Sequence, residues 1–420
     1  MKKSLFILAT AAIALASCNN DVKIAENKTL DDANEIALRP LVPRVMRAPA
    51  AADMDASAIQ SAGFRVTATK TSDASTIYFN NVDYSYDGTA NYTSATKYYW
   101  PSEYNLDFYA YTPISSVLVG SDKQIVPWNT STSAYDADSY KVFKVTPDEA
   151  AANQVDLVYA RTNDWGKCDA SDDSHEIDGT PTGVTINFRH TESKVRIKLY
   201  NSNSNINVIV RDASICNVKT SGIFTFADAN TDGQNTGAGT VLSSSTWTAS
   251  GNGNYKVTDQ SNTKYNGTSS GSAVQVGSED WILIPQTFTY ATAYSGDNAN
   301  DPFNGPCIKI NLKIKNNATG TPGAYIVGAD DDALDDDDNE GYVTAMWPLA
   351  ANPAAGTGWE KGKQYTYTVN LAGGGYYEKN YTGDSGLDPI LASAEIIFVS
   401  VSVDNWATDI SGGTYNTNLP

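Results

Sequence analysis

The sequence has few of the residues on which most catalytic and metal sites depend. Only two histidines and four cysteines are spread over 420 residues, and none of them falls at a spacing typical of a zinc site. Activated nucleophiles need a neighbouring base, and no pair of carboxylates is marked as converging for glycoside chemistry. We therefore expect no enzyme activity, no catalytic residue, no cofactor and no metal site.

Positive charge is scarce as well. The chain has 29 Lys and Arg against 48 Asp and Glu, which gives a formal net charge of -19. Such a chain repels phosphate backbones and anionic lipid headgroups. This balance argues against nucleic acid as a partner and against electrostatic docking to a membrane.

The apolar run near the N-terminus, residues 5–14, is too short for a permanent span of a bilayer core about 30 Å thick. Because Lys2 and Lys3 precede it, residues 1–17 are typical of a signal peptide. The run ends in Leu15-Ala16-Ser17-Cys18, which resembles the lipobox of bacterial lipoproteins. We expect acylation of Cys18, since several acyl chains on one residue give stable anchoring. An ordinary secretory signal with a chance cysteine is the alternative.

Three cysteines remain after Cys18, namely Cys168, Cys216 and Cys307. They form no CxxC motif, and an odd number allows at most one intramolecular bridge. Buried thiols are the favoured interpretation, and the sequence leaves any pairing open.

Residues 18–47 are predicted to be a propeptide. After a polar stretch, Ile36, Leu38 and Val42 fall on one side of a period-two pattern that also contains Pro40. This pattern predicts a strand at a sheet edge, where proline is tolerated. Its removal would uncover the sheet that it completes.

A processing site is predicted directly after this strand. Proline, arginine and alanine are concentrated around residues 43–52, and an arginine in such a linker is exposed to proteases. We expect cleavage after Arg47, which makes Ala48 the new N-terminus, with Arg44 as the rival position.

Beyond residue 64, short runs of alternating apolar and polar residues dominate, which predicts an all-β protein. A polar stretch at 162–183 is the best boundary between two β-sandwich domains, 48–182 and 183–420. The predicted strands are 64–68, 77–79, 106–111, 154–159, 184–188, 195–199, 281–284, 308–314, 365–369 and 396–401.

Several short motifs of the sequence resemble motifs that occur in the same order along the chains of fimbrillins, the type V pilins of Bacteroidales. They are Tyr99-Trp100-Pro101 followed by "LDFYAYTP" at 106–113, "DLVYA" at 156–160, "INFRHTESK" at 186–194, "WILIPQ" at 281–286, "WEKGKQYTY" at 359–367 and "VDNW" at 403–406.

This resemblance implies two transthyretin-like Greek-key sandwiches and polymerisation by strand exchange. A trypsin-like protease at the outer membrane would cut the lipoprotein precursor after an arginine, here Arg47. The vacated groove would then take the C-terminal tail of another subunit. The tail is residues 407–420, a short segment interrupted by glycine, in which Ile410, Tyr415 and Leu419 are the only large apolar residues.

Other features have structural and functional alternatives. A hydrogen-bonded structural role is expected for His190, and His175 lies in an acidic loop. The acidic residues of 330–340 could bind calcium but lack EF-hand spacing, so a solvated loop is favoured. The tryptophans at 100, 281, 347, 359 and 406 are expected in the core rather than as sugar platforms.

The sequence therefore predicts a shaft subunit of a surface fimbrium used in adhesion, which would bind other copies or related subunits and host or bacterial surface ligands. The alternatives are a non-polymerising lipoprotein that binds glycans through exposed aromatics, or a tip or anchor subunit. The ligand, the protease and the position in the fimbrium stay open.

Overall fold

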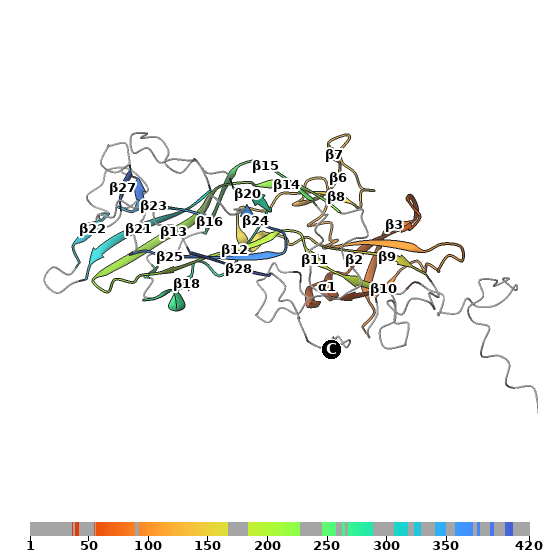
Figure 1. The fold of residues 1–420 in the computed structure, drawn as a ribbon, viewed down its shortest axis with the longest axis horizontal. Coiled ribbons are helices and arrows are strands. Elements are labelled where there is room, and N and C mark those ends of the chain that lie inside the picture. The colour runs from red at the N-terminus through yellow and green to blue at the C-terminus, as the bar shows by residue number, and fades with distance from the viewer. Residues whose placement is uncertain are drawn as a thin grey trace, which may run out of the picture.

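The computed structural model shows an elongated, nearly all-β body, with strands of the N-terminal half at one end and strands of the C-terminal half at the other (Figure 1). The structure describes residues 36, 38–41, 54, 56–88, 92–166, 184–226, 246–257, 263–264, 268–288, 306–317, 323–328, 341–349, 358–372, 376–378, 387–389 and 400–405. The α-helix among them is α1, Ala56–Ala62, and two 3-10 turns are Ala151–Asn153 and Ser270–Ser272.

The first sheet has eight strands in the order β10-β1-β4-β3-β2-β5-β9-β11. The first and last strands in this order, β10 and β11, are consecutive in the chain and are separated only by Phe188. The bounds are β1 Leu38–Leu41, β2 Phe64–Lys70, β3 Asp73–Tyr86, β4 Tyr92–Ser94, β5 Leu106–Thr112, β9 Val158–Trp165, β10 Val184–Asn187 and β11 Arg189–His190.

A second sheet, β15-β14-β8-β6-β7, packs against β5 and β9. Its strands are β6 Ile125–Asn129, β7 Ala134–Tyr135, β8 Val142–Val145, β14 Ser221–Thr225 and β15 Thr246–Ser250. All residues of β5 are buried because a core lies on each of its faces: Phe108 enters one and Tyr109 the other.

The C-terminal half forms two further sheets around one large core. One has the order β18-β12-β25-β28, with β19 beside β12, and the other has the order β16-β13-β21-β23-β26-β27, with β17 and β22 at its side. The first sheet of this pair contains β12 Ser193–Tyr200, β18 Val274–Gln275, β19 Trp281–Leu283, β25 Lys363–Asn370 and β28 Ser400–Asn405. The second sheet contains β13 Ile206–Val218, β16 Gly253–Val257, β17 Thr263–Lys264, β21 Cys307–Asn316, β22 Tyr325–Val327, β23 Val343–Pro348, β26 Tyr376–Glu378 and β27 Leu387–Pro389. A separate two-stranded ribbon pairs β20 Gln286–Thr287 with β24 Gly358–Trp359.

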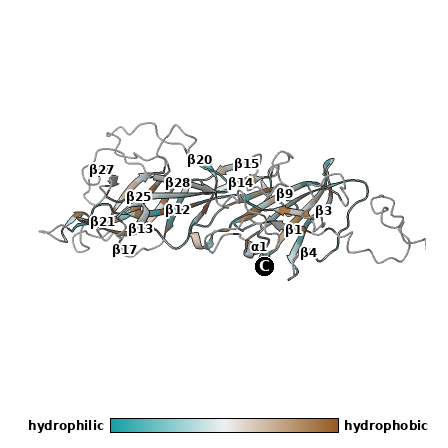
Figure 2. Cartoon of the chain, turned by 60° about the horizontal axis from the view of Figure 1, so that its bottom comes forward, coloured by the Kyte–Doolittle hydropathy of each residue, from teal (hydrophilic) through white to brown (hydrophobic). Residues whose placement is uncertain are grey.

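Period-two alternation explains these strands. In β21, Ile308, Ile310, Leu312 and Ile314 enter the core, while the residues between them lie on the opposite face of the sheet, where Lys309 is half-buried and Lys313 is buried. Hydrophobic and hydrophilic residues accordingly alternate along the strands (Figure 2). The all-β fold class predicted from the sequence is confirmed.

Two expectations need correction or qualification. The strand expected at 154–159 begins only at Val158, because the Leu157 N–H donates to the Glu192 carboxylate instead of a neighbouring strand. The side chains of Gln154 and Asp156 meanwhile contact distant segments. Hydrogen bonds also cross the expected boundary at 182–183, since β10 and β11 join the first sheet and β14 pairs with β8. The division into domains stays a prediction.

Candidate functional site

The strand β1 lies inside the first sheet. It runs parallel to β10 over four residues, from Leu38 opposite Val184 onward, but it pairs with β4 only at Leu38. The sequence-based expectation of an edge strand is therefore wrong. Proline is accommodated because Pro40, which has no N–H, lies beyond the single residue that pairs with β4.

Two apolar side chains anchor this segment in the core. Ile36 is 3% exposed and Leu38 is 1% exposed, and both pack in the cluster that contains Phe64 and Phe188. The Phe64 ring lies 5.4 Å from that of Phe188. If β1 left, an apolar slot would open between β4 and β10.

The other predicted residues of the processing and exchange machinery lie outside the described residues. These are Val42, Cys18, Arg44, Arg47, Ala48, Ile410, Tyr415 and Leu419. Four other features singled out in the sequence also lie outside the described residues, namely Cys168, His175, Trp406 and the acidic stretch 330–340. The last described residue is Asn405, which pairs with Lys363 at the start of β25. Asn405 thus lies at the end of the sheet that adjoins the first half of the chain.

A polar cluster joins the two halves. His190 Nδ1 lies 2.8 Å from Asp156 Oδ2, and the same oxygen accepts a hydrogen bond from the Met54 N–H at 3.0 Å. Both side chains are buried. The structural role expected for His190 is confirmed, and the segment that follows the predicted processing site is tied to the cluster through Met54.

Glu192 completes this cluster in the two-residue link between β11 and β12. Its Oε2 accepts hydrogen bonds from the Thr191 hydroxyl and the Leu157 N–H, at 2.6 and 3.2 Å. Burial, and then the nearby charge of Asp156, raise the pKa of Glu192 well above its ordinary value. Oε1 of Glu192 and Oδ1 of Asp156 are buried without a hydrogen-bond partner.

Further hydrogen bonds fix the junction. Gln154 Oε1 accepts from the Ile282 N–H at 2.5 Å, the Trp247 indole donates to the Thr191 carbonyl at 2.7 Å, and the Gly362 N–H donates to the Glu192 carbonyl at 2.7 Å. Sequence reasoning missed Gln154. The signal was that Gln154 and Asp156, two polar side chains, alternate with the apolar residues at the start of the run.

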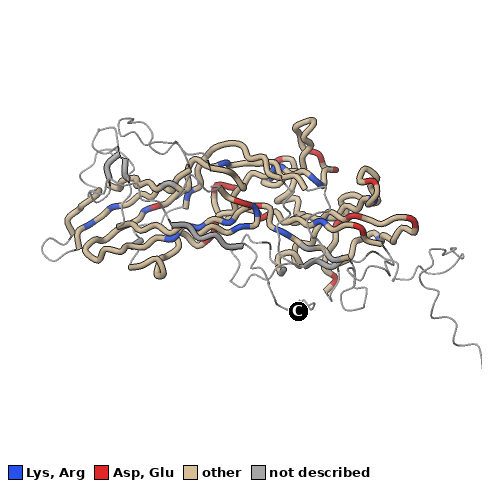
Figure 3. Tube along the Cα trace, in the orientation of Figure 1, with Lys and Arg blue, Asp and Glu red and all other residues tan. Residues whose placement is uncertain are grey.

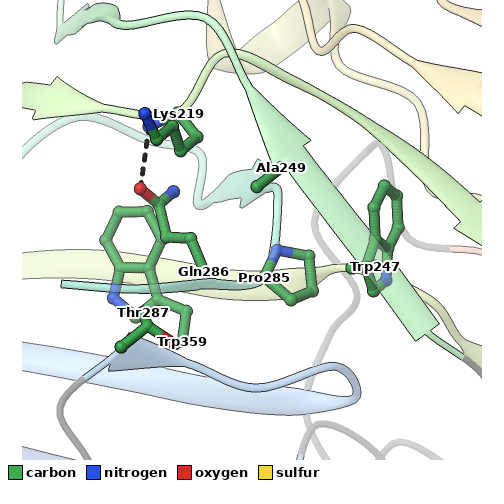
Figure 4. Close-up of a pocket in the computed structure, with 7 residues that line it drawn as sticks. All are labelled: Lys219, Trp247, Ala249, Pro285, Gln286, Thr287 and Trp359. Carbon is green, nitrogen blue, oxygen red and sulfur yellow. Dashed lines mark hydrogen bonds between the residues drawn. The ribbon is translucent and has the colours of Figure 1, made fainter.

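A cavity of about 380 Å³ lies beside this junction, between the β14–β15 hairpin and the β20–β24 ribbon (Figure 4). Its lining residues are Lys219, Trp247, Ala249, Pro285, Gln286, Thr287 and Trp359. Trp359 is 2% exposed and donates its indole N–H to the Tyr367 hydroxyl. Trp281, Trp347 and Trp359 are therefore core residues, as expected.

A smaller hollow of about 210 Å³ lies where β6 and β7 meet the loop before β8. It is lined by Trp128, Asn129, Thr130, Asp136, Asp138, Ser139, Tyr140, Lys141 and Val142. Asn129 donates to Asp136 at 3.1 Å, and Asn81 from β3 donates to the loop carbonyl at 137. Hydrogen bonds within its lining and from β3 therefore position the loop that forms the hollow.

The charges of the described residues are dispersed along the strands (Figure 3). In the part of the chain that the structure describes, no group of three or more His, Cys, Asp and Glu is placed to hold a metal ion. Within the same ranges, no helix is both long and apolar enough to cross a membrane.

The arrangement is that of a β-sheet protein in which an N-terminal strand fills an internal position of the first sheet. The sequence matches the model of the fimbrillin-like family over residues 47–406, so the chain belongs to that family. It is therefore a fimbrial-type protein of the cell surface.

Solved structures that resemble this one have low sequence identity to it. A fimbrial protein from Bacteroides vulgatus is 14% identical, with a TM-score of 0.48, over 89% of this chain and 99% of that chain. The tip fimbrial protein Mfa3 from Porphyromonas gingivalis, with a C-terminal truncation, is 10% identical, with a TM-score of 0.34, over 89% and 100% of the two chains. No curated protein matches the sequence significantly.

Proposed function

We propose that this chain is a fimbrial shaft subunit that is exported as a lipoprotein, cleaved after Arg47 and polymerised by strand exchange. The observation that carries the proposal is the position of β1. The strand fills an internal place in the sheet, yet it pairs with β4 at one residue only. Its loss would leave unpaired main-chain groups and apolar pockets, which another strand can fill.

The chemistry of the C-terminal tail supports the same proposal. Alternation places Tyr415 and Leu419 on one face of an extended tail, with Thr417 between them, and Ile410 on the other face. Ile36 and Leu38 leave apolar pockets on one face of the slot. Because Tyr415 and Leu419 are four residues apart, a donor strand would place one of them in these pockets and the other further along the same face of the slot, and it would leave Ile410 outside.

Mass spectrometry of fimbriae sheared from the cell surface tests the processing step. The proposal expects a mature N-terminus at Ala48 and no lipid. Material that starts at an acylated Cys18 would instead identify an anchor subunit or a lipoprotein that does not polymerise.

A second candidate function is glycan binding without polymerisation. The observation that favours it is the hollow beside β6 and β7, where the aromatic rings of Trp128 and Tyr140 stand near the polar groups of Asn129 and Asp136. Aromatic faces and fixed polar groups are the combination that a sugar ring requires. A tip subunit would also use such a hollow but would lack a working donor tail.

A further inference from the structure

Two cysteines that are far apart in the sequence stand directly opposite each other on neighbouring strands. In the antiparallel pair of β13 and β21, Ile215 faces Ile308 and Cys216 faces Cys307. Directly opposite residues have Cα atoms about 4.5 to 5.5 Å apart and project to the same side of the sheet. This separation lies within the range of about 4.4 to 6.8 Å that a disulfide spans.

The surroundings of the pair suit a structural bridge. Ile215 and Ile308 point into the large C-terminal core, so Cys216 and Cys307 point to the opposite face of the same sheet. Cys216 is 4% exposed and Cys307 is fully buried. The Cys216 thiol donates a hydrogen bond to the Ser214 hydroxyl at 3.4 Å, and a bridge at this place would be shielded from reductants.

We infer that Cys216 and Cys307 form a cross-strand disulfide in the exported protein. Two thiols lose their protons, one S–S bond forms between the strands, and two electrons pass to a protein disulfide of the export compartment, which becomes a dithiol. The inference uses one part of the proposed function, export from the reducing cytoplasm. It does not depend on cleavage or on polymerisation.

The bridge would connect two central strands of the sheet, β13 and β21, whose neighbours are β16 and β23. It would close the long segment between them, so it would restrict the unfolded chain strongly. Cys168 would remain a thiol, because Cys216 and Cys307 would be bonded to each other.

Peptide mapping without reductant tests the pairing in two preparations. Trypsin yields Cys216 in peptide 212–219, Cys307 in peptide 265–309 and Cys168 in peptide 168–189. In full-length protein refolded with oxidised and reduced glutathione, we expect 212–219 joined to 265–309 and Cys168 alkylated. A link to 168–189, or alkylation of both Cys216 and Cys307, would overturn the inference irrespective of export.

The second preparation is protein released from the cell surface. The same linked peptides are expected, whereas reduced Cys216 and Cys307 in exported material would overturn the inference for the cell. A chain that never reaches the surface would give no such material and would count against the proposed function alone, since the refolded protein still tests the pairing.

Serine variants separate the bridge from simple loss of packing. Reduction should lower the midpoint of thermal unfolding of the wild type by about 5 to 15 °C. C216S and C307S should each have this lower midpoint and no longer respond to reductant, whereas the matched control C168S should behave as the wild type. A reductant response that persists in C216S or C307S would contradict the bridge.

Discussion

The carboxylate of Asp156 connects two segments that are far apart in the sequence, because its Oδ2 lies 2.8 Å from His190 Nδ1 and also accepts a hydrogen bond from the Met54 N–H. Met54 follows the proposed cleavage position, so its contact would persist in the mature subunit. The buried cluster therefore belongs to the permanent body, whereas β1 belongs to the removable part.

The first prediction concerns the pH dependence of stability at this cluster. The pKa of Glu192 is raised by burial and by the charge of Asp156, which lies just before β9 and is hydrogen-bonded to His190. The native state therefore keeps a proton that the unfolded chain releases at about pH 4.3. Stability from this group is present below that pH and is lost as the pH rises toward the native pKa, by at most about 1.4 kcal/mol per pH unit.

Replacement of Glu192 by glutamine should remove this slope, since the amide stays neutral and its oxygen can accept the same two hydrogen bonds. Thermal unfolding measured between about pH 4 and pH 9 should show E192Q gaining stability over the wild type as the pH rises. E103Q, which alters an exposed carboxylate, serves as the control. Parallel curves for wild type and E192Q would refute the assignment.

The sequence predicted the parts of the fold that follow from local alternation, such as β5 and β21, because side-chain period decides which face is buried. It misplaced β1 at an edge, since the partners of a strand depend on contacts with β10, which is far along the chain. It also missed the role of Gln154, whose hydrogen bond to the Ile282 N–H bridges distant segments. Local patterns carry no information about such long-range pairs.

The second prediction is that β1 stabilises the precursor only. Leu38→Ala should lower the free energy of unfolding of the uncleaved chain by about 2 to 4 kcal/mol, because it empties a buried apolar pocket. The stability of the cleaved protein without its propeptide should be unchanged, since residue 38 is gone. Urea denaturation of both forms measures this.

The control for that experiment is Val117→Ala, at a side chain that is 73% exposed. It should leave both forms unchanged. If Leu38→Ala destabilised neither form, the segment would not be held in the sheet in solution.

The third prediction is that limited trypsin treatment of the folded precursor cuts at Arg47 or Arg44 and leaves a resistant body that begins near Ala48. Arginines in the sheets are protected, because Arg161 and Arg196 are 3% and 9% exposed and their backbones are paired. N-terminal sequencing identifies the cut. A first cut between residues 64 and 113 would show that the propeptide boundary is wrong.

The fourth prediction tests the second candidate function at the hollow beside β6. If a sugar binds there, Trp128→Ala should weaken its binding at least about tenfold, since an aromatic face is lost. Tyr135→Ala is the matched control, because Tyr135 faces Trp128 across the hairpin and is 46% exposed, yet does not line the hollow. Saturation-transfer NMR with neutral and N-acetylated sugars measures both, and equal binding by Trp128→Ala would exclude the hollow as the site.

The last prediction is that cleaved protein assembles into ladders on gels through residues 407–420. Deletion of this tail should stop ladder growth while circular dichroism still reports a folded subunit, because the tail follows the last sheet strand, β28.

Serine at both Tyr415 and Leu419 should weaken assembly, since both side chains would enter the slot left by β1. Serine at Ile410 is the control and should leave assembly intact, because alternation turns residue 410 to the other face.

The uncleaved precursor should stay monomeric, since β1 already occupies the slot. Ladders that form equally well without the tail would exclude it as the donor, and a cleaved wild-type protein that remains monomeric would favour the glycan-binding alternative.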